Sequence, residues 1–151
     1  MRAIKQIIYH QSGYPNDTVE SITRWHTTPP GPDPKKPKGL GWATIGYHFV
    51  LTPDAKVHKT LAQSLVGNHC AGDNAYSIGV CCIGQGNAFP LDQGYMTLEM
   101  FVALLKLTRQ LQAAYPMIGR SLSGHREKGS GISQGKSCPG WEVGILRALV
   151  L

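Results

Sequence analysis

Two histidines and one cysteine from opposite ends of the chain are the feature that most restricts how it can fold. His10 ends an apolar run near the N-terminus, whereas His125 and Cys138 lie in a Gly- and Ser-rich segment near the C-terminus. Two imidazoles and one thiolate suit Zn²⁺, and a site with three protein ligands leaves a fourth position for water, as in catalytic zinc sites. If these residues bind one metal ion, the two ends of the chain must meet in the fold.

The length and composition are those of one ordinary globular domain. With 151 residues, 42% of them hydrophobic and 16% charged, the chain is long enough to enclose a single core, and we expect residues 1–151 to form one domain. No apolar run approaches the roughly 18 residues of a membrane span. The run of only about five apolar residues before His10 is too short for the core of a signal peptide. These features predict a protein that is made and folded in the cytoplasm.

The net charge of +6, from 15 Lys and Arg against 9 Asp and Glu, is compatible with two interpretations. A basic surface attracts polyanions such as nucleic acid, anionic lipid or acidic cell-wall polymers, but a charge excess can also serve solubility alone. Apart from Lys35, Lys36 and Lys38 the charges do not cluster, and the sequence has no basic helix with interleaved aromatic residues. We therefore expect no nucleic-acid partner.

The four cysteines are expected to be free thiols, because the cytoplasm keeps thiols reduced. Cys81 and Cys82 are adjacent in an apolar run, so on a strand they should point to opposite faces, with one of them in the core. Cys70 has no distinctive surroundings in the sequence. Cys138 differs from the others, because Lys136 lies two residues before it.

Short apolar runs bounded by turn residues predict five strands. They are expected at residues 4–10, 45–51, 57–60, 77–84 and 121–125. Because helical patterns lie between these runs, the sequence predicts an α/β fold: a single domain with a mixed central sheet flanked by about three helices.

The three helices have different signals in the sequence. The first is expected to open at Asp17 and Glu20, which have the spacing of a capping box. The second and longest covers residues 97–115, where apolar residues fall on helical spacing, and Pro116 should end it. The third is expected at residues 141–151.

The strand pattern also bears on the three candidate ligands. If the strands that carry His10 and His125 are parallel neighbours, both imidazoles lie at one edge of the sheet, and a Gly-rich loop can bring Cys138 to them. Spacing alone is a weak argument, because six His make chance combinations common and a histidine at a strand end is more often hydrogen-bonded or exposed than a metal ligand. His26 and His58 are expected on exposed or half-buried faces.

Five segments, in order along the chain, resemble the zinc-dependent N-acetylmuramoyl-L-alanine amidases. This type 2 amidase family includes the lysozyme-like phage endolysins and the peptidoglycan-recognition proteins. The segments are IIYHQS at 7–12, Trp25–His26 followed by GWATIGYHFVL at 41–51, VGNHCAGDNAYSIGVCCIG at 66–84, GHRE at 124–127 and KSCPG at 136–140. Each motif is modest alone, but five in the correct order between about residues 5 and 145 are highly specific.

The resemblance implies that His10, His125 and Cys138 bind one Zn²⁺ per chain, the same trio that ligand chemistry suggests. It also implies catalytic roles for Tyr47 and Lys136. A bound zinc ion lowers the pKa of its water to about 7 and polarises a carbonyl group. Lys136 could then stabilise the oxyanion of the tetrahedral intermediate, and Tyr47 could hydrogen-bond the water or that oxygen. For Tyr47 the alternative is a strand aromatic that only packs on its neighbours.

Contacts to the substrate are less sharply defined. His69 and Asn74, in the segment that resembles the groove-lining loop, are candidates for binding the muramyl or stem-peptide portion, and Trp42 is a candidate for a flat apolar wall. A packing or turn-stabilising role is equally expected for each of them. The Pro- and Lys-rich loop at 28–41 is longer than the family pattern leads us to expect. It extends the substrate groove, gives a basic handle for an anionic wall, or is a tolerated surface insertion.

The resemblance implies a peptidoglycan hydrolase that cleaves the amide bond between N-acetylmuramic acid and L-alanine. We expect a monomeric phage or prophage endolysin, made in the cytoplasm, that reaches the periplasmic wall through a separate export or holin-type route. A cytosolic amidase that recycles muropeptides is an alternative with the same chemistry. A non-catalytic peptidoglycan-binding module is another alternative. The resemblance implies that family members without the third metal ligand act as receptors, so the presence of Cys138 argues against this alternative. A structural zinc site would need a fourth ligand, such as His48 or His69.

Overall fold

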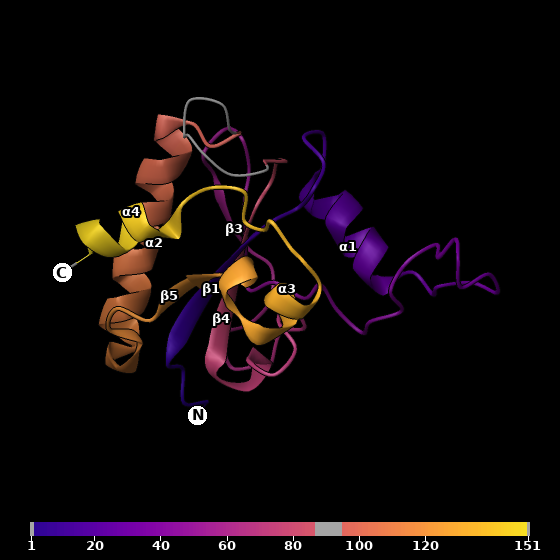
Figure 1. Cartoon of the computed structure of the whole chain (residues 1–151), viewed down its shortest axis with the longest axis horizontal. Helices are drawn as coiled ribbons and strands as arrows, with labels where there is room; N and C mark the ends of the chain where they lie inside the picture. Colours follow the sequence, from indigo (N-terminus) through magenta and orange to yellow (C-terminus); the bar gives the residue numbers. More distant parts are fainter. Residues whose placement is uncertain (1, 87–94, 151) are drawn as a thin grey trace.

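A five-stranded mixed sheet runs through the centre of the computed structural model, which describes residues 2–86 and 95–150 (Figure 1). In the sheet β1 pairs in parallel with β4 and β5, β2 pairs in parallel with β4, and β3 pairs antiparallel with β2. The strand order is β3-β2-β4-β1-β5. The strands are β1 (Gln6–Gln11), β2 (Phe49–Leu51), β3 (Val57–Lys59), β4 (Ser77–Cys82) and β5 (Leu122–Gly124). The predicted α/β class and mixed sheet are confirmed.

Helices cover both faces of this sheet. α2 and α4 lie together on one side, and α1 and α3 lie on the other (Figure 1). The described residues contain four α-helices: α1 (Val19–Thr27), α2 (Leu98–Ala114), α3 (Gly129–Ser133) and α4 (Val143–Leu149). None of these helices is both long enough and apolar enough to span a membrane.

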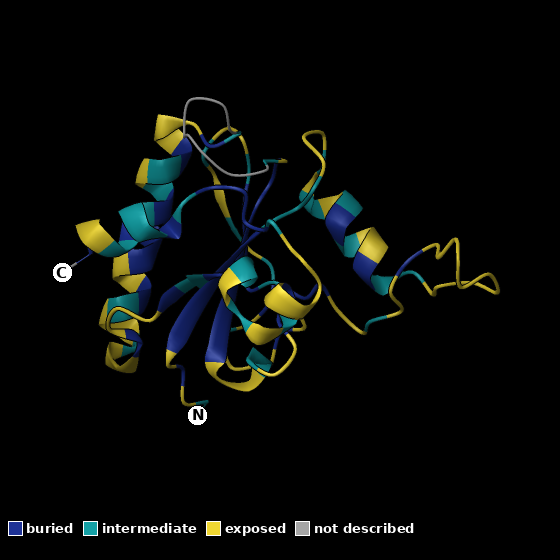
Figure 2. Cartoon of the chain, in the orientation of Figure 1, coloured by how far each residue is buried: buried dark blue, intermediate teal, exposed yellow. Residues whose placement is uncertain are grey.

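Alternation along the central strands decides what each face of the sheet buries. Tyr9 of β1 lies beside Val80 of β4, and both belong to the main hydrophobic core under α2 and α4. The next residue along β1, His10, therefore points to the opposite face, which carries α1 and a second, smaller hydrophobic cluster. The central strands β1, β2 and β4 are buried on both faces, whereas the edge strand β3 is largely exposed, as are the outer sides of the helices and many loop residues (Figure 2).

The same alternation separates the two adjacent cysteines. Cys82 lies in the core under α2, whereas Cys81 lies in the smaller cluster on the other face. The prediction that these two thiols point to opposite faces is confirmed, and both are buried. All four cysteines are free.

The first helix begins one residue later than predicted. Its N-cap is Thr18, whose side chain accepts a hydrogen bond from the Ser21 N–H at 3.0 Å, and Ser21 Oγ accepts from the Thr18 N–H at 2.9 Å. The predicted capping box of Asp17 and Glu20 is therefore wrong. Asp17 lies directly before the cap and accepts a hydrogen bond from Ser21 Oγ at 2.9 Å.

Other elements differ in extent from the sequence prediction: β1 begins at Gln6 and not at residue 4, and β4 ends at Cys82 and not at residue 84. The strand expected at residues 45–51 is confined to Phe49–Leu51. The last helix begins at Val143, because Glu142 is its N-cap and accepts a hydrogen bond from the Gly144 N–H at 2.9 Å. Leu151, the last residue of that predicted helix, lies outside the described residues. Gly129–Ser133, expected to be part of a flexible loop, forms α3. The long predicted helix is confirmed as α2 and stops before Pro116.

The Pro- and Lys-rich loop projects from the end of α1 and returns to it (Figure 1). Its return path is held by backbone hydrogen bonds from Leu40 to Trp25 at 2.9 Å and from Trp42 to His26 at 2.8 Å. The three lysines of the loop, Lys35, Lys36 and Lys38, are all exposed. The loop is thus an ordered extension of the face that carries α1.

Candidate metal centre

Parallel pairing of β1 with β5 brings His10 and His125 together. Tyr9 lies opposite Gly124 in the register, so the next residue of each strand emerges at the same edge of the sheet. His125 is there the first residue of a short 3-10 turn, and its ring centroid is 4.8 Å from that of His10. The predicted arrangement of parallel neighbours is confirmed.

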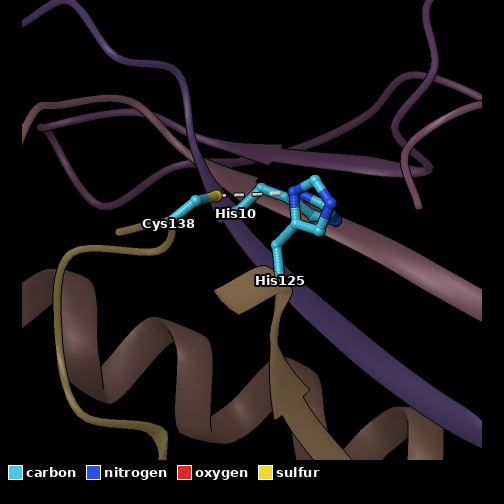
Figure 3. A group of neighbouring side chains, drawn as sticks. All are labelled: His10, His125 and Cys138. Atoms are coloured by element: carbon cyan, nitrogen blue, oxygen red, sulfur yellow. Dashed lines mark hydrogen bonds between the residues drawn. The ribbon is translucent and has the colours of Figure 1, made fainter. Parts of the chain in front are cut away.

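Cys138 approaches the two histidines from the segment that follows α3. Its Sγ is 3.7 Å from Nδ1 of His10 (Figure 3). The same sulfur accepts a hydrogen bond from the Gln11 N–H at 3.2 Å. The backbone of Cys138 is also fixed, because its carbonyl accepts from the Arg126 N–H at 2.8 Å. The ligand atoms of His10, His125 and Cys138 all lie within 4.8 Å of one another, close enough to share one ion.

The protonation states of the three side chains suit a metal ion. Burial, with His69 and His125 nearby, lowers the pKa of His10 well below its usual value, and burial lowers that of His125 with a further contribution from Lys136. Both imidazoles are then neutral, the form that binds metals. Burial raises the pKa of Cys138 to about 11, and a bound cation removes that proton. Two neutral imidazole nitrogens and one thiolate sulfur at these separations fit Zn²⁺.

The cluster has three members, and the two histidines considered as fourth ligands are engaged elsewhere. Nδ1 of His69 lies 3.0 Å from Nε2 of His10. The other ring nitrogen of His10, Nδ1, is the one that faces Cys138. Nδ1 of His48 accepts the Gly79 N–H at 3.0 Å. In the described part of the chain, this trio is the one group of three or more His, Cys, Asp or Glu close enough for a metal. Three protein ligands leave one position open, as in catalytic zinc sites.

A cleft of about 550 Å³ opens over the cluster on the face that carries α1 and α3. Tyr47 and Lys136, the two predicted catalytic residues, both line it. The Tyr47 ring centroid is 5.1 Å from that of His10, and burial raises the pKa of its phenol well above the usual value, so the hydroxyl keeps its proton. Lys136 is exposed, so its ammonium group stays in water at the edge of the cleft.

The three residues predicted to contact substrate have different surroundings in the structure. Trp42 lines the cleft, with its ring centroid 4.6 Å from that of His26. His69 also lines the cleft, but it is buried. Asn74 is not among the lining residues, and its Oδ1 instead accepts the backbone N–H groups of His69 at 3.0 Å and Cys70 at 2.8 Å. Asn74 therefore stabilises the turn that carries His69.

His26 and His58 were both predicted to lie on exposed or half-buried faces. His58 is half-buried, as expected. His26 is buried, so the prediction was wrong for this residue. Its Nδ1 accepts the Gly46 N–H at 3.0 Å, a backbone contact 20 residues away that only the tertiary structure creates.

A serine that no sequence motif indicates as functional lies next to His125. Ser130 of α3 has its Oγ 3.1 Å from Nε2 of His125 and 3.3 Å from Sγ of Cys70. This contact occupies Nε2 and leaves Nδ1 of His125 for a metal. α3 can pack this closely because Gly131 has no side chain. A Cβ at this position would lie 1.8 Å from the carbonyl oxygen of His125. A Gly-rich run in the sequence carries no signal for such a role.

Comparison with known proteins agrees with this geometry. A family model described as N-acetylmuramoyl-L-alanine amidase matches residues 1–141. The endolysin of Enterobacteria phage K11 is 32% identical over 98 residues, which are 65% of this chain and 58% of that protein. The endolysin of Klebsiella phage KP32 is 30% identical over 125 residues, 83% of this chain and 71% of that protein. Among solved structures, the endolysin amidase LysCS from Clostridium intestinale has a TM-score of 0.77 at 25% identity, over 97% of this chain and 83% of that one.

Proposed function

Because the chain belongs to the N-acetylmuramoyl-L-alanine amidase family, we propose that it hydrolyses the amide bond between N-acetylmuramic acid and the L-alanine of the stem peptide. The observation that carries this proposal is the cluster of His10, His125 and Cys138 at the floor of the cleft, with Tyr47 and Lys136 on its walls. A protein that only binds peptidoglycan needs the cleft but not three converging metal ligands. The donor set therefore favours hydrolysis over simple recognition.

The three ligands would hold Zn²⁺, which when bound supplies a Lewis acid that lowers the pKa of a water molecule and polarises the scissile carbonyl. Tyr47, whose hydroxyl stays protonated, can donate a hydrogen bond to the carbonyl oxygen as it gains charge. Lys136 adds a positive charge at the mouth of the same cleft, where it favours the oxyanion of the tetrahedral intermediate. Trp42 offers an aromatic wall against which a sugar ring can pack.

Host lysis is the biological role that the relatives support. The chain is 32% and 30% identical to the endolysins of phages K11 and KP32. We propose that this protein is likewise a phage or prophage endolysin, reaching the wall by a separate export or holin-type route, and that residues 1–151 act as one catalytic domain and as a monomer. A muropeptide-recycling amidase would have the same chemistry but a different substrate.

Digestion of two substrates tests both levels of this proposal. The purified protein, with its zinc measured, is incubated with intact sacculi and separately with soluble anhydro-muropeptides, and the products are identified by mass spectrometry. New L-alanine N-termini from sacculi support an endolysin, whereas cleavage of soluble fragments alone supports recycling. About one zinc per chain is expected. Full activity after complete removal of metal would contradict the zinc mechanism, and binding of sacculi without cleavage would show a receptor.

A further inference from the structure

We propose that His69 is a positioning residue that holds His10 in the tautomer and orientation in which Nδ1 is presented to the metal. The proposal rests on the proposed role of His10 as a ligand. It gives His69 a function other than contact with substrate, and it accounts for a buried histidine that the hydrolytic mechanism itself does not use.

The direction of each hydrogen bond follows from the atoms that face one another. Nδ1 of His10 faces Cys138 Sγ at 3.7 Å, and Nε2 of His10 faces Nδ1 of His69 at 3.0 Å. A neutral imidazole carries one proton, so a His10 that binds metal through Nδ1 must carry it on Nε2. That N–H then donates to Nδ1 of His69. A ligand histidine that donates its second N–H in this way has its ring orientation fixed and its basicity raised.

The chain of hydrogen bonds continues away from the cleft and ends on the backbone. Because Nδ1 of His69 accepts, the His69 proton lies on Nε2, which is 3.2 Å from Ser77 Oγ. Ser77 Oγ in turn donates to the carbonyl oxygen of Asp73 at 2.8 Å. Each donor in the series therefore meets one acceptor, and the final acceptor is a fixed carbonyl group. This arrangement selects one tautomer for His69 and hence one for His10.

Packing holds His69 in this role. The side chain is buried, its backbone N–H donates to Asn74 Oδ1 at 3.0 Å, and a Cβ on Gly79 would come within 2.6 Å of the ring. The ring also stacks edge-on against His48, with centroids 5.9 Å apart. Both ring nitrogens are engaged within the protein, so neither is left to bind a substrate.

The next residue along the chain supports the second histidine ligand in a similar way. Cys70 Sγ lies 3.3 Å from Ser130 Oγ, which lies 3.1 Å from Nε2 of His125. His69 and Cys70 thus back the two imidazole ligands from one turn, and Asn74 fixes that turn by accepting from both of their backbone N–H groups. The turn is a support for the metal site as well as a wall of the cleft.

A pair of substitutions separates positioning from substrate binding. His69→Phe keeps an aromatic ring over Gly79 but removes the acceptor, whereas His69→Asn places an amide oxygen close to the position of Nδ1. Zinc affinity is measured by competition with a chromophoric chelator, and the absorption spectrum of the Co²⁺-substituted protein reports ligand geometry. His69→Phe should weaken zinc binding about 10- to 100-fold and alter the Co²⁺ spectrum, and His69→Asn should restore most of both. His58→Phe, a histidine of β3, is the control and should leave both unchanged.

Two outcomes would overturn the proposal. One is His69→Phe with wild-type zinc affinity and Co²⁺ spectrum but a raised KM for a soluble muropeptide, which would make His69 a substrate contact. The other, independent of any variant, is a ¹⁵N NMR spectrum of the zinc-loaded wild-type protein that places the His69 proton on Nδ1. These readouts do not need hydrolysis, so a protein that binds zinc without cleaving peptidoglycan would contradict the proposed function and leave the positioning role standing. A wild-type protein that binds no zinc would contradict both.

Discussion

The imidazole of His69 lies so close to Gly79 that a Cβ at Gly79 would come within 2.6 Å of two of its ring carbons. Gly79 is in the middle of β4 and pairs with Ile8 of β1, two residues before His10. The missing side chain on β4 is therefore what allows the ring of His69 to settle against the sheet and reach His10. The support that we propose for His10 therefore depends on the absence of a side chain at Gly79.

Replacing this glycine should damage both the fold and the site. Gly79→Ala inserts a methyl group into closely packed surroundings, and we expect the free energy of unfolding to fall by about 1–3 kcal/mol. The displaced His69 should also weaken zinc binding. Urea denaturation and chelator competition measure the two effects. Gly129→Ala is the matched control, because its Cβ would meet nothing within 4 Å, and it should keep stability and zinc affinity. Equal behaviour of the two variants would refute the packing argument.

Loss of the thiolate ligand should remove the metal without unfolding the protein. Cys138→Ser is expected to weaken zinc binding by more than the roughly 10- to 100-fold that loss of an outer-shell partner causes, and hydrolysis should be lost with it. Metal analysis and turbidity loss of sacculi measure these effects. Cys82→Ala, in the core on the other face of the sheet, should keep its zinc. A zinc-replete, active Cys138→Ser protein would exclude this residue as a ligand.

Loss of the Tyr47 phenol should lower the rate of hydrolysis without changing the zinc content of the protein. Tyr47→Phe removes one hydrogen-bond donor beside His10, so we expect kcat to fall about 10²- to 10³-fold with little change in KM or zinc content. Tyr14→Phe alters a tyrosine that is 71% exposed and serves as the control. If Tyr47→Phe keeps the wild-type kcat, its ring has the packing role considered as the alternative.

The charge on Lys136 should have an effect that the loop lysines lack. Lys136→Met removes the ammonium group at the cleft, and we expect kcat on a small soluble muropeptide to fall about 10²-fold or more. Lys35→Met, in the exposed loop, should leave hydrolysis of that small substrate unchanged. Comparison on sacculi then shows whether the loop binds the anionic wall. A large loss of activity on the small substrate with Lys35→Met would contradict this division of roles.

Acid should destabilise the protein partly through His26. Burial lowers the pKa of His26 to about 4, below its usual 6.5, and its Nδ1 can accept the Gly46 N–H only when unprotonated. Between pH 6.5 and 4 the unfolded chain therefore binds the proton more readily than the folded one, so this contribution to stability is present above pH 6.5 and is lost as the pH falls. It amounts to roughly 3 kcal/mol at most.

Urea denaturation of wild type and His26→Gln between pH 5 and 8 checks this. The difference in unfolding free energy between the two proteins should shrink as the pH falls, because glutamine does not titrate in this range. Other acid-sensitive groups, including the metal ligands, are common to both proteins and cancel in the difference. A difference that stays constant with pH would show that His26 does not carry this part of the acid sensitivity.

Much of the fold could be predicted because it depends on local patterns. The long helix α2 has helical spacing, a Thr97 cap and a Pro116 stop, and all three lie within or beside the helix itself. α3 could not be predicted in the same way. Its glycines are poor helix formers, and one of them, Gly131, is needed only because the helix packs on the backbone of His125. The requirement comes from a contact, so the local sequence gives no sign of it.

The residue types along the chain are enough to predict which side chains could bind a metal and that Tyr9 and His10 face opposite sides of the sheet. Both follow from residue chemistry and from the period of two that covalent geometry imposes on a strand. Two contacts arise only in the packed chain: His69, 59 residues from His10, lies against the second ring nitrogen of His10, and Ser130 lies against His125. Such pairings depend on strand register and on glycines that permit close approach, and these are properties of the packed chain.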